Sequence, residues 1–348
     1  MSAPPITPPP HHRPDGRFRN PWPGSVEHGL GSILRWTIDR ARNGTLGFRA
    51  RGTPPSAVAS CPALPRSKAD ECRITWIGHS SFLIQVGGLN VLTDPVFSER
   101  ASPVHFAGPR RLAPPGLALD ALPPIDLVLQ SHDHYDHFDA DTIRVLARRS
   151  ASTVWCAPLG LAARLRELGV RSVTECDWLG SAEPVPGARV ACVPARHFSG
   201  RSPTGRNATL WCGWTLSAGA HRVYFVGDSA FHPDFATIGE REGPFDAVLM
   251  PIGAYDPRWF MSAVHMNPEE AVAAFLALHS AHPSHQSVMA AMHWGTFALT
   301  DEPVDEPPRL ARAAWERAAL SPDTLWVFAP GETRVLGGYA RASGKAGL

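Results

Sequence analysis

The feature of this sequence that most constrains its fold is a cluster of histidines and aspartates that follows an apolar run. Residues 127–129 are Leu-Val-Leu, and residues 131–137 are Ser-His-Asp-His-Tyr-Asp-His. The apolar run predicts a buried strand over 126–130. That strand carries the cluster to its carboxyl end, where the chain leaves the sheet. The fold must therefore place a polar site at this edge of a sheet.

The spacing within the cluster is typical of metal ligands. Side chains two residues apart in extended backbone point the same way, so His132 and His134 can bind one metal ion together. Where the chain then turns, Asp136 and His137 can face a second ion. Imidazole and carboxylate ligands suit Zn²⁺, and also Mn or Fe. The alternative is a solvated histidine-rich loop without function, and the apolar strand that leads into the cluster argues against it.

Composition narrows the function classes. The 348 residues suffice for one large α/β domain or two small ones, and 44% hydrophobic and 19% charged residues are ordinary for a globular chain. The formal net charge of +1 does not indicate the strongly positive surface that nucleic-acid-binding proteins have. The six cysteines form no C-x-x-C pair, which favours reduced thiols in a cytoplasmic protein. No signal peptide and no membrane span are expected.

The chain begins with segments unlike the rest. Residues 1–24 are rich in proline and arginine and predict an extended arm, residues 25–43 contain an amphipathic helix, and residues 51–70 predict a linker. We expect the helix to pack on the protein, with a membrane-facing helix as the alternative. The predicted organisation is therefore an N-terminal arm, helix and linker over 1–70 and a domain that contains the histidine cluster over 71–340.

The remaining sequence predicts an α/β (α+β) fold. Gly87-Gly88 between two apolar runs predicts a hairpin, and Asn267-Pro268-Glu269-Glu270 is typical of a helix start. In each half of the chain, strands come first as hairpins and then alternate with helices, which indicates two mixed β-sheets packed together with helices outside. Strands are expected over 74–77, 81–86, 89–92, 126–130, 153–156, 190–193, 210–216, 222–226, 246–250, 287–292, 325–328 and 333–336, and helices over 141–149, 159–168, 267–279 and 308–320.

The pattern H-x-H-x-D-H at 132–137 resembles the signature of the metallo-β-lactamase superfamily. That family has a four-layer αββα sandwich and needs three further ligands, each after a strand: a histidine, a bridging aspartate and a last histidine. His197, Asp228 and His293 match them in order. The resemblance implies two zinc ions, with Mn or Fe as alternatives. It assigns His132, His134 and His197 to one ion, Asp136, His137 and His293 to the other, and Asp228 to both.

Flanking motifs resemble one branch, the N-acyl-phosphatidylethanolamine-hydrolysing phospholipase D group. They are the segments 16–23, 76–81, 92–97, 100–103, 108–111, 255–261 and 267–271. The branch implies a zinc-dependent phosphoric diester hydrolase that uses a hydroxide shared by both metals as the nucleophile. Its substrate would be a small-molecule or lipid phosphodiester. The resemblance also implies a homodimer, and any membrane contact of a chain without a membrane span would be peripheral.

Several residues near the cluster have predicted roles. Asp136 and His265 are the catalytic candidates. His265 precedes a helix start, a position that can bind phosphate, so it would contact the phosphoryl group or protonate the leaving alkoxide. A capping or surface histidine is the alternative. Tyr135 and Trp259 are further candidate substrate contacts, with packing as the alternative for each.

The neighbouring charged residues have mainly structural interpretations. We expect Asp133 to orient a ligand histidine from behind, and His79 to make a structural hydrogen bond near the site. Asp94 is interpreted as a buried structural residue. Arg110 and Arg111 could bind an anionic head group, but a solvated basic pair is the commoner case.

Three other functions compete with the phosphodiesterase. A lactone or sugar-phosphate ester hydrolase, similar to the ascorbate-6-phosphate lactonases, would use the same ligands. A non-catalytic binding protein of this fold would be free to lose ligands, and all seven are present here. A nuclease of the same fold would need a basic surface, which the near-neutral charge does not favour.

Overall fold

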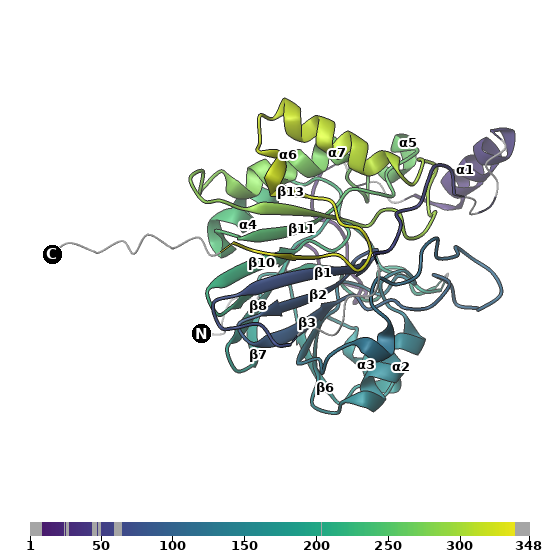
Figure 1. Ribbon diagram of the computed structural model, residues 1–348. Helices are drawn as coiled ribbons and strands as arrows, with labels where there is room; N and C mark the ends of the chain where they lie inside the picture. Colours follow the sequence, from purple (N-terminus) through teal and green to yellow (C-terminus); the bar gives the residue numbers. More distant parts are fainter. Residues whose placement is uncertain are drawn as a thin grey trace, which may run out of the picture.

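Two seven-stranded β-sheets lie face to face in the computed structural model, with helices on their outer faces (Figure 1). The structure describes residues 9–23, 25, 28–43, 47, 50–58, 65–202 and 204–337. The predicted boundary at residue 340 and Cys61 lie outside these residues. The other five cysteines are buried free thiols, as expected. The predicted four-layer sandwich of two mixed sheets is confirmed.

The first sheet has the strand order β14-β1-β2-β3-β4-β5-β6. Strands β1 to β3 form antiparallel hairpins, the second one through Gly87-Gly88 as predicted, and β3 to β6 then run parallel. Strand β14 pairs antiparallel with β1. The bounds are β1 Cys72–Gly78, β2 Ser81–Val86, β3 Leu89–Thr93, β4 Leu127–Leu129, β5 Val154–Pro158, β6 Ser172–Cys176 and β14 Thr333–Val335.

The second sheet repeats this plan in the order β13-β12-β11-β10-β9-β8-β7. Strands β7 to β10 are antiparallel and β10 to β13 parallel. The bounds are β7 Ser181–Val185, β8 Ala188–Val193, β9 Gly213–Ala218, β10 His221–Phe225, β11 Ala247–Pro251, β12 Val288–Met292 and β13 Leu325–Trp326.

The helices complete the outer layers. Figure 1 shows α2 and α3 beside the first sheet and α4, α6 and α7 over the second. Asp139 caps α2. Asn267 caps α6 through a capping box, at the helix start that the sequence predicts. The bounds are α1 Leu30–Arg42, α2 Ala140–Arg149, α3 Ala162–Glu167, α4 Asp234–Glu242, α5 Arg258–Met261, α6 Pro268–His279 and α7 Glu306–Arg317, with 3₁₀ turns at Leu119–Ala121 and Pro322–Thr324.

The hydrophobic core has two main parts. The larger cluster fills the space between the sheets and beneath α4, α6 and α7, and includes the fully buried Trp76, Trp214 and Phe225. The smaller one joins the outer face of the first sheet to α2 and α3. Because both faces of each sheet are covered, the central strands are buried along their whole length, and most of them are short apolar runs.

The described part of the N-terminal arm is more closely packed than an extended arm suggests. Phe18 and Trp22 are buried in the larger core cluster. Helix α1 packs on the protein, as expected, because Trp36 stacks on Phe260 at 5.1 Å between ring centroids. Its other face leaves Leu34 exposed. Within the described residues, no helix is long and apolar enough to cross a membrane.

Candidate metal centre

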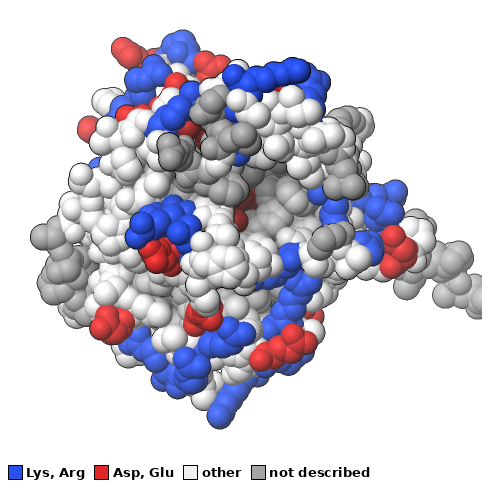
Figure 2. Space-filling view, turned by 90° about the vertical axis from the view of Figure 1, so that its right-hand side faces the viewer, with Lys and Arg blue, Asp and Glu red and all other residues white. Residues whose placement is uncertain are grey.

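The candidate ligands meet at one edge of the sandwich, where strands from both sheets end. The first sheet supplies the segment 131–137 after β4, and also His79 after β1. The second supplies His197 after β8, Asp228 after β10 and His293 after β12. The loops at this end face the viewer in Figure 2, where the surface is hollowed and acidic atoms are visible within the hollow.

One half of the site consists of three imidazole rings. The Nε2 atom of His132 lies 2.9 Å from Nδ1 of His134, which in turn lies 3.1 Å from Nε2 of His197. The three rings therefore converge on one point, as expected for ligands of one ion. The other ring nitrogen of His197 lies 2.9 Å from the carbonyl oxygen of Val264, which orients that ring.

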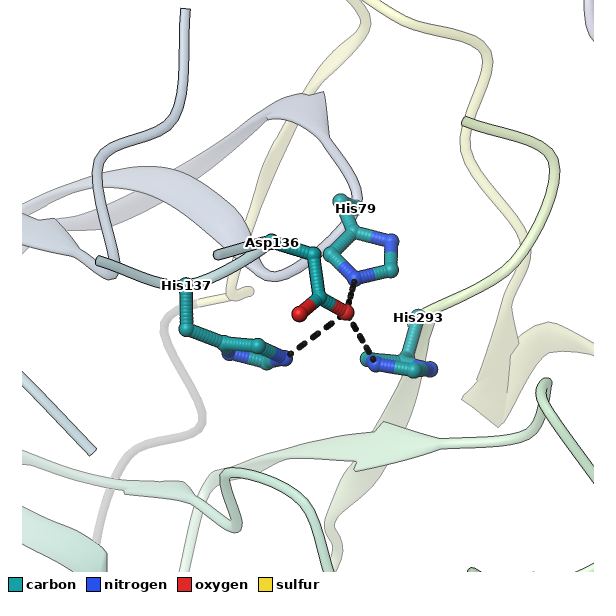
Figure 3. Close-up of side chains that lie close together, drawn as sticks. All are labelled: His79, Asp136, His137 and His293. Carbon is teal, nitrogen blue, oxygen red and sulfur yellow. Dashed lines mark hydrogen bonds and ion pairs between the residues drawn. The ribbon is translucent and has the colours of Figure 1, made fainter. Parts of the chain in front are cut away.

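The other half surrounds the carboxylate of Asp136 (Figure 3). Its Oδ2 atom lies 3.6 Å from His137 Nε2 and 3.5 Å from His293 Nε2. His79 Nε2 is also 3.0 Å away, within hydrogen-bond distance. His79 thus makes the expected hydrogen bond, and its partner is one of the candidate ligands.

Asp228 lies between the two halves. Its Oδ2 atom is 3.0 Å from His293 Nε2, 3.1 Å from His137 Nε2 and 3.7 Å from His197 Nε2. One carboxylate therefore faces rings from both groups, the position that a bridging ligand requires. Gly227 makes this possible with a φ of +65°, because a Cβ there would lie 2.7 Å from the Cys212 carbonyl oxygen.

The buried polar atoms of the site fit metal ions. His137 Nε2, His293 Nε2 and Asp228 Oδ1 are buried and make no hydrogen bond to any described residue. Buried polar groups are nearly always satisfied, so nitrogen and carboxylate atoms that face one another without hydrogen bonds are suited to bind a cation.

The protonation states of His134, His197 and Asp228 agree with this interpretation. Burial lowers the pKa of His134 to about 4 and that of His197 to about 3, so both rings are neutral. Burial by itself would raise the pKa of Asp228, but His137 and His293 hold it well below its usual range. Burial by itself would lower the pKa of His293, but Asp228 and Asp136 raise it to about 9, so these carboxylates hold a positive charge beside them. Neutral imidazole and ionised carboxylate are the forms that bind metals.

Asp94, after β3, fixes one of the candidate ligands from behind. Its Oδ2 atom accepts a hydrogen bond from His137 Nδ1 at 2.6 Å, and its Oδ1 atom accepts one from the Ser131 N–H at 2.7 Å. Gln130 donates to the same carboxylate at 3.0 Å. Such a contact sets both the orientation and the tautomer of a ligand histidine. The interpretation of Asp94 as a structural residue was incomplete.

The role predicted for Asp133 was wrong. Its carboxylate accepts hydrogen bonds from Arg164 at 2.6 Å and from the Gly200 N–H at 2.8 Å, and it contacts no ligand ring. The alternation of an extended run correctly turned this side chain away from the metal side. On that side Asp133 meets Arg164 of α3 rather than a ligand histidine. Only the packing of α3 against this segment determines that contact.

Backbone strain is concentrated around the site. The φ values are +56° at His79, +28° at Asp94 and +61° at His293, in a region of backbone conformation that residues other than glycine seldom adopt. Strained backbone persists where the surroundings enforce it, often at functional sites. Here the N–H of His293 donates to the carbonyl oxygen of His79 at 3.1 Å and joins the two strand ends.

His265 lies at the edge of the metal centre rather than on the surface. Its Nδ1 atom is 4.0 Å from Asp228 Oδ2, and its ring centroid is 4.9 Å from that of His197. It does not cap α6, because the Asn267 side chain accepts from the Glu270 N–H. The Glu270 carboxylate accepts a hydrogen bond from the Asn267 N–H and also pairs with Arg258. A carboxylate therefore lies at this helix start, where the sequence predicted a bound phosphate.

The other predicted contacts lie farther out. The Tyr135 hydroxyl donates to the Arg201 carbonyl oxygen at 2.9 Å, so it already has a partner. Trp259, with 37% of its surface exposed, packs under Arg35 of α1 and is not among the residues around the ligands. Arg110 is exposed, as expected, and forms an ion pair with Glu99. Arg111 departs from the expected solvated pair, because it is half-buried and donates to the Val96 carbonyl oxygen at 2.6 Å.

Comparison with known proteins agrees with this geometry. The family model described as a β-lactamase superfamily domain matches residues 89–294. An uncharacterised protein of Mycobacterium tuberculosis is 42% identical over 332 residues, which cover 93% of this chain and 83% of the relative. The chain belongs to the metallo-β-lactamase superfamily. This member also resembles a metallo hydrolase from Ignicoccus hospitalis in fold, with a TM-score of 0.58 at 24% identity over 77% of this chain and 99% of that one.

Two further relatives have informative names. The N-acyl-phosphatidylethanolamine-hydrolysing phospholipase D 1 of Caenorhabditis elegans is 40% identical over 234 residues, 65% of this chain and 64% of that enzyme. A metal-dependent hydrolase of Methanopyrus kandleri is 30% identical over 263 residues, 75% of this chain and 98% of the relative. The expected resemblance to the phospholipase D branch is confirmed. This superfamily member is a metal-dependent hydrolase with a His/Asp metal-binding cluster.

Proposed function

We propose that the protein is a binuclear zinc-dependent phosphodiesterase of the N-acyl-phosphatidylethanolamine phospholipase D type. The observation that carries this proposal is the position of Asp228, whose carboxylate faces buried rings from both halves of the site. Two of these rings, those of His137 and His293, have Nε2 atoms without a hydrogen-bond partner among the described residues. The proposed ligands are His132, His134 and His197 for one ion, Asp136, His137 and His293 for the other, and Asp228 for both.

The residues of the site have distinct tasks in this proposal. Bound divalent ions supply the positive charge that lowers the pKa of a water molecule and offsets charge on phosphoryl oxygens. Asp94 and the Val264 carbonyl hold the rings of His137 and His197 in place. His265, at the edge of the cluster, is placed to bind the phosphoryl group or to protonate the leaving oxygen.

The proposal of a phosphodiester rather than a lactone as the substrate rests on the resemblance to the phospholipase D branch. The nematode relative is named for the hydrolysis of a lipid phosphodiester, and this chain covers 64% of its length. The metal ligands by themselves would serve a lactone equally well. The experiment therefore compares classes: the zinc-loaded protein is incubated with bis(p-nitrophenyl) phosphate, with a lactone panel and with mixed phospholipids analysed by mass spectrometry.

The outcomes separate the candidates. Hydrolysis of the phosphodiester and release of phosphatidic acid support the proposal. If only lactones are hydrolysed, the protein is a lactonase instead. If the model phosphodiester is cleaved but the phospholipids are unchanged, only the lipid substrate is rejected. The matched control is the same protein with Asp228→Asn, which tests whether the measured activity comes from this site.

His265→Ala is expected to lower phosphodiester turnover by about 10²–10⁴-fold, the range typical of general acid–base groups. Metal content should stay at the wild-type value, because His265 is not a proposed ligand. Turnover and zinc per chain, measured on the same preparation, test this. His105→Ala, a change at a side chain that is 90% exposed, serves as the control. Wild-type turnover in His265→Ala would remove the catalytic role.

A further inference from the structure

The N-terminal arm contacts the loop that carries His197. The Asn20 side-chain amide donates to the His197 carbonyl oxygen at 2.8 Å, although 177 positions separate the two residues. The carbonyl of Asn20's own amide, Oδ1, is buried and has no hydrogen-bond partner among the described residues. The bond to His197 is therefore the only side-chain hydrogen bond of Asn20 in the described part of the protein.

Further bonds join the arm to the rest of this loop. The Phe18 N–H donates to the Asn207 carbonyl oxygen at 2.9 Å, and Arg17 Nη1 donates to the Arg206 carbonyl oxygen at 2.8 Å. The Asn207 N–H in turn donates to the Ser199 carbonyl oxygen at 2.9 Å. The loop over 197–209 is thus held from the arm at both its ends.

The arm is itself clamped to the connection between β6 and β7. His11 Nε2 and His12 Nε2 lie 2.7 Å and 2.8 Å from the two carboxylate oxygens of Asp177. The His11 ring also stacks on Trp178, with centroids 4.3 Å apart, and Trp22 stacks on His232 at 4.5 Å. These contacts fix the arm on either side of Asn20 and so determine where its amide lies.

We propose that Asn20 is a positioning residue of the metal centre, and that the His11–His12–Asp177 clamp holds it in register with His197. The inference depends on the proposed role of His197 as a ligand. Val264 fixes the ring of His197 from one side, and Asn20 fixes its backbone from another. With both in place, the ring stays 3.1 Å from His134, ready to share an ion with it. Without Asn20 the peptide can rotate away from that position.

The test measures zinc affinity rather than turnover. Asn20→Ala should weaken zinc binding by about 10–100-fold, the usual cost of removing an outer contact of a ligand. Asp177→Ala should weaken it in the same direction by releasing the clamp. The double variant should be no weaker than Asn20→Ala, because the clamp acts through Asn20. Zinc affinity is measured by competition with a chromophoric chelator, and circular dichroism and thermal unfolding of each zinc-free variant report its folding.

The controls distinguish positioning from general destabilisation. Arg19→Ala removes a neighbouring arm side chain whose hydrogen bond, among the described residues, is to the Pro10 carbonyl oxygen, and it should bind zinc as the wild type does. Wild-type affinity in Asn20→Ala, or additive losses in the double variant, would overturn the inference. His197→Ala is measured in parallel. If it weakens binding while Asn20→Ala does not, only the inference falls. If His197→Ala binds zinc normally, the ligand assignment of the proposed function falls, and the inference with it.

Discussion

Asp228→Asn is expected to reduce phosphodiester turnover by more than about 100-fold, beyond the 10–100-fold typical of outer contacts. The substitution keeps the shape of the side chain and removes its charge. The carboxylate lies within 3.7 Å of His137, His197 and His293, so both halves of the site lose their shared acidic group. Zinc per chain, determined by mass spectrometry, should fall together with turnover.

A matched substitution tests whether the effect is local. Asp141→Asn makes the same chemical change at a half-exposed aspartate on α2, where the carboxylate pairs with Arg144. This variant should retain wild-type zinc and turnover, since surface ion pairs contribute little. The bridging role of Asp228 is contradicted if Asp228→Asn binds two zinc ions and hydrolyses the substrate at the wild-type rate.

Asp94→Ala should destabilise the protein by about 3–5 kcal/mol, the usual cost of removing one partner of a buried pair. Asp94 is fully buried, and His137, Ser131 and Gln130 would all lose their shared acceptor. Denaturant unfolding of the zinc-free protein measures the loss of stability. Zinc affinity should fall by about 10–100-fold as well, because the His137 ring is no longer held.

The control for Asp94 is a second buried aspartate with no link to a ligand. Asp139 caps α2 and accepts from the Ser98 N–H at 2.8 Å. Asp139→Ala should lose stability, by about 0.5–2 kcal/mol for the cap, but should keep its zinc affinity. If both variants bind zinc as the wild type does, Asp94 has only the structural role that the sequence suggested.

Sequence patterns identified the central strands and missed the marginal elements. Strands β4, β11 and β12 are buried along their whole length and appear in the sequence as apolar runs. Strand β7 lies at a sheet edge and is mostly half-exposed, so its residues carry no clear alternation, and β6 was missed for the same reason. Helix α5 has four residues, too few for a helical period to show.

The roles of single residues followed a similar division. The cluster at 132–137 could be predicted because it lies just after an apolar strand, and local spacing determines which way such residues point. The resemblance to the family supplied His197, Asp228 and His293. The partners of Asp94, Asp133 and Asn20 could not be predicted, because each contacts a segment between 31 and 177 positions away. The sequence did contain a signal for Asp94. This residue directly follows the end of β3, and the candidate ligands likewise lie just after strand ends.

The sequence by itself determined that a strand would deliver a metal-binding cluster to a sheet edge, and which residue types would meet there. Backbone alternation and strand length act over a few residues, and they suffice for that. Only the tertiary structure decided that Asp228 lies between the two halves, that Asp94 holds His137, and that the arm packs against the loop of His197. These contacts depend on how the two sheets and the arm pack together, which no local pattern encodes.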